Sequence, residues 1–283
     1  MSSDHDLRDP TGTAAQPMKR LPVPGGQMAY LDEGSGSPVL LIHGTPSSSH
    51  EWRHVVRALA PRHRVLAPDH LGFGASDRPS DWRTYSLPWH TANLRAWVEA
   101  LDLPRFHLVV HDFGGPIALP LVLDAPERLL SLTIVQSWLW DLGAPNIDNP
   151  VMRWLYLSAN FSARMLVKMS WGKRRKLTAA LHREFKQQFP DRASRAGTWG
   201  FARSVTRERQ LMDEQGARLG ALKNVPVLLV WGKADRIVRP NHLERWKTLF
   251  PKAEVLELDD VGHFPQLEAP EDLVAALDRQ LDG

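Results

Sequence analysis

The chain of 283 residues contains no cysteine. Disulfide bonds and thiolate chemistry are therefore excluded, and a nucleophile must use oxygen or nitrogen. A cysteine-free chain is typical of a reducing compartment, so we expect a cytoplasmic location. No run approaches the ~20 apolar residues needed to span a bilayer. Residues 1–17 are polar and lack the regions of a signal peptide, so we expect a disordered tail.

An excess of charge of one sign is also missing. The 35 Lys and Arg residues and 32 Asp and Glu residues leave a formal net charge of +3. This balance argues against nucleic acid and against a membrane as partners. The one basic run, residues 173–176, is interpreted as a solvated helix face. Oligomeric state is left open between monomer and homodimer.

Short apolar runs bounded by turn residues predict strands that are buried on both faces. The runs are Pro38–Ile42, Arg64–Ala67, Phe106–Val110, Leu132–Val135, Val227–Trp231 and Ala253–Leu258. Residues 19–23 and 27–32 flank Pro24-Gly25-Gly26 and predict an antiparallel hairpin at the sheet edge. Helical stripes lie between the runs, as in residues 51–60, 88–101 and 271–281. The pattern predicts an α/β fold with a mostly parallel, eight-stranded sheet and helices on both faces.

The alternation stops between residues 138 and 221, where only helical stripes occur and five of the eleven tryptophans are found. A helical insertion at this point would cover the carboxyl ends of the strands, where ligands bind in such sheets. We therefore expect a core domain of residues 18–137 and 222–283, with residues 138–221 forming a helical cap.

The segment Val109-Val110-His111-Asp112-Phe113-Gly114-Gly115 follows an apolar strand and precedes a helix over residues 116–124. A sharp strand-to-helix turn of this kind presents a nucleophile, and the two glycines permit close backbone approach. The nucleophile here is Asp112. A carboxylate attacks an sp3 carbon and forms an alkyl ester, which water then hydrolyses.

Two further residues complete a catalytic triad. His263, directly after the last strand, is the expected base. Asp235 lies on a loop after the strand at residues 227–231 and is the acid expected to orient the imidazole. A packed histidine and a helix-capping aspartate are the structural alternatives for these two residues.

The loop His43-Gly44-Thr45-Pro46 follows an earlier strand. It places the backbone N–H of Thr45 opposite that of Phe113, and the two form an expected anion hole. His43 and His111 are interpreted as structural. His107 and His111 lack a third ligand, so no metal site is expected. No cofactor is needed.

From about residue 19 onward the chain resembles the α/β-hydrolase superfamily, with a cap inserted after the sixth strand. The matching motifs are HDFGG, HGTP, DHLGFGASDRP (residues 69–79), WGKAD and GHFPQLEAP. Among these enzymes it is most similar to haloalkane dehalogenases. The resemblance implies hydrolysis of a small hydrophobic haloalkane by water, with Asp112, His263 and Asp235 as triad.

Both halide-binding side chains of the dehalogenases are altered. They place Trp after the nucleophile and Asn or Glu in the HG-x-P loop, whereas this chain has Phe113 and Thr45. Phenylalanine offers no donor. An indole N–H from Trp138 or Trp140 could hold the halide instead. Trp140, Tyr156 and Phe264 are candidates for the substrate pocket.

Epoxide hydrolases are the next most similar group. They protonate the ring oxygen with cap tyrosines, and Tyr156 is the one tyrosine of the predicted cap. A non-catalytic ligand-binding protein would not need the full triad. An esterase is disfavoured because Asp112 replaces the hydroxyl nucleophile.

Overall fold

A computed structural model of the chain describes residues 18–282, so the predicted tail of residues 1–17 lies outside the described residues. Its centre is one eight-stranded sheet in the order β1-β2-β4-β3-β5-β6-β7-β8. The strands are β1 Lys19–Val23, β2 Gly26–Glu33, β3 Pro38–Ile42, β4 Arg64–Pro68, β5 Phe106–Asp112, β6 Leu129–Ser137, β7 Val227–Gly232 and β8 Glu254–Leu258. β2 pairs antiparallel with β1 and β4, and all other pairs are parallel. The predicted sheet and its edge hairpin are confirmed.

Alternate residues of each central strand enter different cores. In β5, Leu108 and Val110 join one apolar cluster, whereas Val109 joins the other. Side chains point to opposite faces along a strand, so a strand that is apolar throughout must be covered on both sides. This explains why the parallel strands appear in the sequence as continuous apolar runs.

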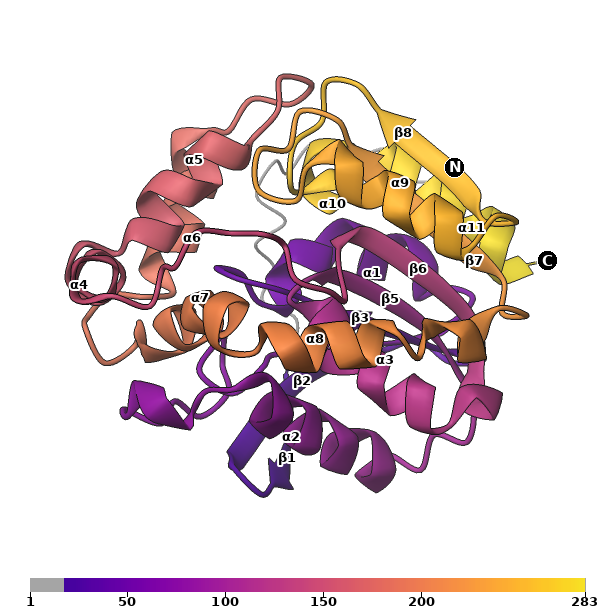
Figure 1. Cartoon of the computed structure of the whole chain (residues 1–283). Helices are drawn as coiled ribbons and strands as arrows, with labels where there is room; N and C mark the ends of the chain where they lie inside the picture. Colours follow the sequence, from indigo (N-terminus) through magenta and orange to yellow (C-terminus); the bar gives the residue numbers. More distant parts are fainter. Residues whose placement is uncertain (1–17, 283) are drawn as a thin grey trace, which may run out of the picture.

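Two groups of helices supply that cover (Figure 1). α1 (Arg53–Leu59) and α11 (Pro270–Asp282) pack on one face, next to the short α10 (Pro265–Glu268). α2 (Leu87–Ala100), α3 (Gly114–Asp124) and α9 (Pro240–Leu249) contribute to the cluster on the other face. The core is thus a three-layer arrangement with the ends of the parallel strands left open.

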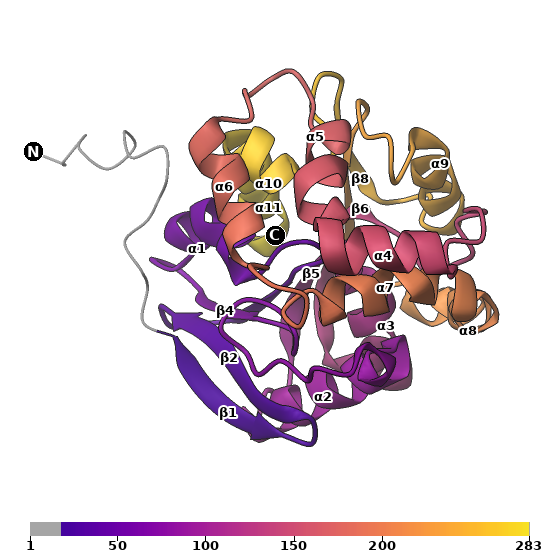
Figure 2. The same cartoon turned by 90° about the vertical axis from the view of Figure 1, so that its left-hand side faces the viewer.

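A helical insertion follows β6 and covers those strand ends. It contains α4 (Pro150–Ala159), the π-helical turn η4 (Ser162–Leu166), α5 (Val167–Ser170), α6 (Ala179–Gln187), α7 (Ala196–Arg207) and α8 (Arg209–Gly216). We call this insertion the cap. It lies beside the sheet in Figure 1 and toward the viewer in Figure 2. Among residues 18–282, no helix has the length and apolarity needed to cross a membrane.

Candidate active site

The turn between β5 and α3 holds Asp112 in a left-handed backbone conformation with φ of 49°. Aspartate adopts this conformation infrequently, and holding it there costs on the order of 1–3 kcal/mol, which surrounding contacts must offset. One such contact is the Ser137 hydroxyl of β6, which donates to the Asp112 carbonyl oxygen at 2.6 Å. The turn presents the Asp112 side chain at the carboxyl end of the sheet.

Close packing against the neighbouring loop requires a glycine. A Cβ atom on Gly44 would lie 2.3 Å from Asp112 Oδ1, far inside van der Waals contact. The loop can therefore approach the carboxylate only because residue 44 has no side chain.

We expect Gly44→Ala to lower activity about 100-fold, because a displacement of the Asp112 carboxylate near 1 Å disturbs the reacting geometry. Steady-state turnover together with thermal unfolding would test this. Gly143→Ala is the matched control, because a Cβ at Gly143 meets no atom within 4 Å. Gly143 has a φ of 65°, so its substitution tests backbone strain without collision. Equal losses of activity in both variants would contradict the expectation.

Each carboxylate oxygen of Asp112 has its own partner. The Thr45 N–H donates to Oδ1 at 2.9 Å. His263 Nε2 lies 3.2 Å from Oδ2, without the alignment of a hydrogen bond. One oxygen is thus fixed by the backbone, while the other faces the imidazole.

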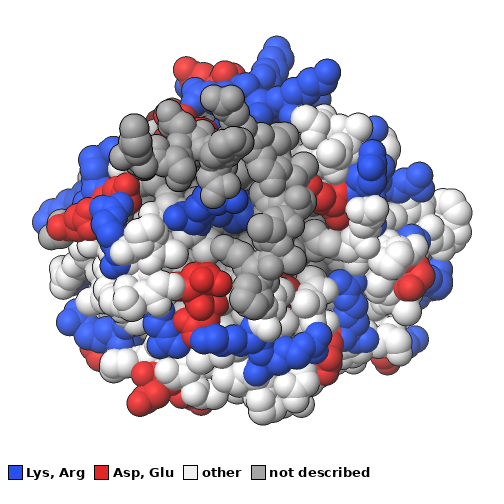
Figure 3. Space-filling view, turned by 180° about the vertical axis from the view of Figure 1, so that it is seen from behind, with Lys and Arg blue, Asp and Glu red and all other residues white. Residues whose placement is uncertain are grey.

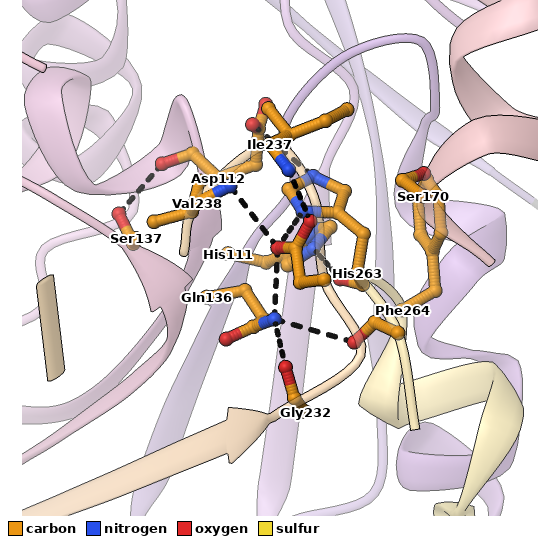
Figure 4. Close-up of polar contacts among 12 residues, drawn as sticks. His111, Asp112, Gln136, Ser137, Ser170, Gly232, Ile237, Val238, His263 and Phe264 are labelled. Atoms are coloured by element: carbon orange, nitrogen blue, oxygen red, sulfur yellow. Dashed lines mark hydrogen bonds and ion pairs between the residues drawn. The ribbon is translucent and has the colours of Figure 1, made fainter. Parts of the chain in front are cut away.

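His263 and Asp235 are the other two residues of the predicted triad, and Figure 4 shows His263 beside Asp112. His263 Nδ1 lies 2.7 Å from Asp235 Oδ2. Asp235 Oδ1 accepts the Ile237 N–H at 2.7 Å, and Oδ2 accepts the Val238 N–H at 3.3 Å. These donors identify both Asp235 oxygens as acceptors, so Nδ1 must carry the hydrogen and Nε2 faces Asp112.

Gln136 is a site residue that sequence reasoning missed. Its Nε2 donates to Asp235 Oδ2 at 2.8 Å and to the Gly232 carbonyl at 3.0 Å. Like Asp112, it has a left-handed backbone, with φ of 44°. The one side-chain amide in β6, next to its last residue, was the available signal.

The charges of the triad depend on one another. Burial lowers the pKa of His263, but the Asp235 and Asp112 carboxylates outweigh it and hold this pKa well above its usual value. Burial raises the pKa of Asp112, but the interaction with His263 dominates and lowers it. The free site therefore contains an imidazolium between two carboxylates.

His111 and Glu51 form a second buried pair next to His263. His111 Nε2 lies 2.8 Å from the His263 carbonyl oxygen, and its Nδ1 lies 2.9 Å from Glu51 Oε1. A carbonyl only accepts, so Nε2 carries a hydrogen and one further proton lies between Nδ1 and Glu51. His111 thus holds the backbone of His263, and Glu51 is a second residue that the sequence did not reveal.

His43 lies within the loop, with its Nδ1 2.7 Å from the Gly44 carbonyl, while Nε2 accepts the His70 N–H. Burial lowers the pKa of His43 to about 4, so it is neutral. Phe113 is the N-cap residue of α3, and its ring packs against Trp138 and Phe201. The Thr45 hydroxyl is buried and has no hydrogen-bond partner within residues 18–282.

A cavity of about 460 Å³ lies between the Asp112 carboxylate and the cap. Its walls are mostly apolar, and its rim includes the exposed residues Arg236, Ile237 and Arg239. Of the predicted site residues, those that line it are Thr45, Asp112, Phe113, Trp138, Tyr156, His263 and Phe264. Such a cavity suits a small apolar ligand.

The two candidate indole donors are engaged elsewhere. Trp138 lines the cavity, but its N–H is donated to the Met212 sulfur at 3.4 Å. Trp140 is not among the lining residues, and its N–H donates to His242 Nδ1 at 2.9 Å. Residues of α8 and α9 thus accept both indole N–H groups, and the position of Trp140 outside the cavity lining corrects the placement expected for it.

Tyr156 and Phe264 lie at the cavity, as expected for pocket residues. Burial raises the pKa of Tyr156, and the negative charge of Asp112 raises it further, so the phenol keeps its proton. The Phe264 ring stands perpendicular to His263 at 5.0 Å between centroids. Residues 18–282 contain no cluster of three or more His, Asp or Glu side chains suited to a metal ion.

The model of the family described as "alpha/beta hydrolase fold" matches residues 37–270. The chain belongs to this family. This α/β-hydrolase is 30% identical over 261 residues to Haloalkane dehalogenase 2 of Mycobacterium tuberculosis, covering 89% of this chain and 90% of the relative. The structure of haloalkane dehalogenase DatA from Agrobacterium tumefaciens superimposes with a TM-score of 0.80 at 26% identity, covering 94% and 96% of the two chains.

Another relative of this α/β-hydrolase is named for a different activity. Cis-3-alkyl-4-alkyloxetan-2-one decarboxylase of Shewanella oneidensis is 30% identical over 267 residues, covering 88% of this chain and 83% of the relative. The chain is thus related to haloalkane dehalogenases, and its relatives include decarboxylases.

Proposed function

We propose that this α/β-hydrolase cleaves carbon–halogen bonds of haloalkanes through an ester on Asp112. The observation that carries the proposal is the Asp112 carboxylate at the floor of a mostly apolar cavity, with His263 Nε2 3.2 Å from Oδ2. The relationship to a haloalkane dehalogenase supports it. Water is the only cosubstrate.

In the first step, Asp112 Oδ2 attacks the sp3 carbon, and the halide leaves with the electron pair of the broken bond. We assign the attack to Oδ2 because Oδ1 accepts the Thr45 N–H. Oδ1 then becomes the ester carbonyl oxygen. The same N–H stabilises its negative charge when water adds, a contribution of about 100- to 1000-fold for one such donor.

The second step needs a neutral imidazole. Alkylation removes the charge of Asp112, one of the two carboxylates that raise the pKa of His263. This pKa therefore falls when the ester forms, and Nε2 becomes able to accept a proton from water. Water adds to the ester carbonyl, the alcohol leaves, and the carboxylate is restored.

This switch predicts different pH dependences for the two steps. Ester hydrolysis should accelerate as pH rises, because a larger fraction of His263 in the ester is neutral. Alkylation should stay constant over neutral pH, because Asp112 has a lowered pKa and is already ionised. Single-turnover measurements of halide release and ester decay between pH 5.5 and 8.5 would separate the steps, and parallel profiles would contradict the switch.

Leaving-group stabilisation predicts a halogen preference. Phe113 offers no side-chain donor, and the indole of Trp138 is bonded to Met212. A hydrogen bond to a charged group contributes about 1.5–3 kcal/mol, and its loss affects chloride, the poorer leaving group, most. We expect bromoalkanes to react faster than matched chloroalkanes. Met212→Leu, which frees the indole, should narrow this ratio, and an unchanged ratio would exclude Trp138 from halide binding.

The decisive experiment measures halide and proton release from brominated and chlorinated alkanes. Wild type should release both, and Asp112→Ala neither. Glu127→Ala is the matched control, because Glu127 is an exposed carboxylate on a distant turn. No release from any haloalkane would reject the proposal.

The second candidate is opening of a strained oxygen ring by the same nucleophile. Tyr156 favours it, because a buried phenol that keeps its proton can protonate an oxygen leaving group. Epoxides would add water and give diols, and an oxetan-2-one would divide into an alkene and carbon dioxide, a decarboxylation as in the name of the Shewanella relative. Loss of both ring-opening activities in Tyr156→Phe, with halide release retained, would assign the phenol to this chemistry.

A further inference from the structure

The outer surface of the cap exposes apolar side chains. Val151 and Trp154 of α4 are 68% and 59% exposed, and Met165 and Met169 of η4 and α5 are 48% and 50% exposed. Among residues 18–282, seven large hydrophobic side chains are exposed, and these four together with Ile237 at the cavity rim make up five of them. Each pair is spaced three or four residues apart and so shares one helix side.

These side chains are not needed to form the cavity. Ser162, Leu166 and Ser170 of the same helical segment line the cavity, so Met165 and Met169 lie on its other side. α4 and α5 form the outermost layer of the cap in both views (Figures 1 and 2). We call the exposed side of these two helices the cap face. Grouped apolar exposure of this kind marks an interaction surface.

The charge of the same segment is one-sided. The 35 residues from 149 to 183 contain no Asp or Glu, and the rest of the chain has 27 basic and 32 acidic residues. The eight basic residues of the segment are Arg153, Arg164, Lys168, Lys173, Arg174, Arg175, Lys176 and Arg183. On the rear of the molecule, by contrast, acidic and basic side chains are interspersed (Figure 3).

Three of these cations belong to the cap face itself. Arg153, Arg164 and Lys168 are exposed, and none forms a salt bridge with a carboxylate of residues 18–282. Arg153 also lies over the Trp82 ring, a contact that leaves its charge in place. Arg174 and Arg175, in the following loop, are instead paired with acidic residues of the core. The cap face thus combines apolar side chains with positive charge that the protein does not neutralise.

We propose that the cap face docks on the surface of an anionic lipid bilayer. Trp154 and the two methionines would enter the boundary between headgroups and acyl chains, with the cations on lipid phosphates. A second copy of this chain is a poorer partner, because it would bring its own positive charges against those of the cap face. A nucleic acid is also a poorer partner, because its phosphate backbone offers no apolar surface for Val151 and Met165. The proposal departs from the expectation drawn from net charge, because a total of +3 averages over this asymmetry.

Docking would serve a substrate dissolved in the membrane. The cavity that reaches Asp112 is lined by α5 and by the exposed rim residues Ile237, Arg236 and Arg239. Because α5 belongs to both the cap face and the cavity wall, docking would bring the cavity close to the bilayer. The docking itself does not depend on the chemistry at Asp112.

Cosedimentation of the full chain with vesicles tests the proposal. We expect binding to phosphatidylglycerol-containing vesicles at low salt, and none to pure phosphatidylcholine. Each cation near an anionic surface contributes roughly fivefold to partitioning, so the triple change Arg153→Gln, Arg164→Gln and Lys168→Gln should weaken it about 100-fold. Trp154→Ser with Met169→Ser should weaken it by roughly tenfold or more. Turnover of a water-soluble substrate should stay unchanged in both.

The matched control removes three exposed cations from the opposite end of the sheet, as Arg105→Gln, Lys223→Gln and Lys252→Gln, and should bind as wild type. An equal loss of vesicle binding in this control would mean that binding depends on overall charge and not on the cap face, and it would overturn the proposal. So would a lack of binding to anionic vesicles. Binding to single-stranded DNA that is tighter than binding to vesicles, and that the Trp154 change does not weaken, would assign the cap face to nucleic acid. A dimer that the Trp154 change dissociates would assign it to a second copy of this chain.

Discussion

Replacing His263 with glutamine should stop the enzyme after one turnover and leave the alkyl group on Asp112. In the proposed mechanism alkylation uses the Asp112 carboxylate and no proton transfer, so halide should still be released once per active site. Release should be fastest at high pH, because the variant lacks the His263 interaction that lowers the pKa of Asp112. Hydrolysis needs Nε2 to activate water, and general-base removal costs about 100- to 10,000-fold. Intact-mass measurement after incubation with a bromoalkane should show the protein heavier by one alkyl group.

Two controls make this result interpretable. The double change Asp112→Ala with His263→Gln should gain no mass, which locates the ester. His263→Phe provides a second variant without hydrogen-bonding capacity, in case glutamine positions a water. Sustained turnover in either single variant would mean that another group, such as the nearby His111, serves as base. The His111 and His263 ring centroids are 4.9 Å apart.

Asp235→Asn should lower turnover by about 10,000-fold, the loss typical of a triad aspartate replaced by its amide. The surrounding donors explain why an amide fails in either orientation. If the asparagine NH2 points toward Ile237, it meets the Ile237 N–H, which in the wild type donates to Asp235 Oδ1. With its NH2 toward His263, it faces the Gln136 amide and requires the wrong imidazole tautomer. Each orientation places donor against donor.

The Asp235→Asn variant should still release about one equivalent of halide, because the nucleophile is unchanged. Rapid-quench measurement of a halide burst followed by slow turnover would establish this. Asp141→Asn, a change on the loop that precedes α4, is the matched control and should behave as wild type. A burst abolished in Asp235→Asn would show that the acid also controls the position of Asp112.

Much of the sheet could be predicted because its strands are buried on both faces and therefore apolar. The predicted strands were too short where their ends contain polar residues. The structure extends β5 to Asp112 and β6 from Leu129 to Ser137, whereas apolar runs predicted Phe106–Val110 and Leu132–Val135. Strand pairing continues through these polar residues because backbone hydrogen bonds do not depend on side-chain polarity.

The triad positions follow from motifs at strand ends, and the structure brings Asp112, His263 and Asp235 together. The supporting residues could not be predicted in the same way. Glu51 lies 60 positions before His111, and Gln136 lies 99 positions before Asp235. Such contacts are set by tertiary packing, which a single sequence does not encode as a local pattern.

Indole orientation in the cap shows the same limit. The sequence places Trp138 and Trp140 after β6. The direction of each indole N–H, however, is set by its acceptor, Met212 or His242, on helices much later in the chain. Composition could identify possible donors near the site. It could not tell which direction each N–H faces.

The order of the site along the chain has a consequence for synthesis. Asp112 is made early, whereas His263 and α11 are among the last residues of the 283-residue chain. α11 also covers the sheet face formed by Val39, Val109 and Val230. Because chains emerge from the amino terminus, the proposed nucleophile exists before either its proposed base or a complete core. The same short carboxyl-terminal segment completes both, so a chain cut short before it should be unfolded as well as inactive.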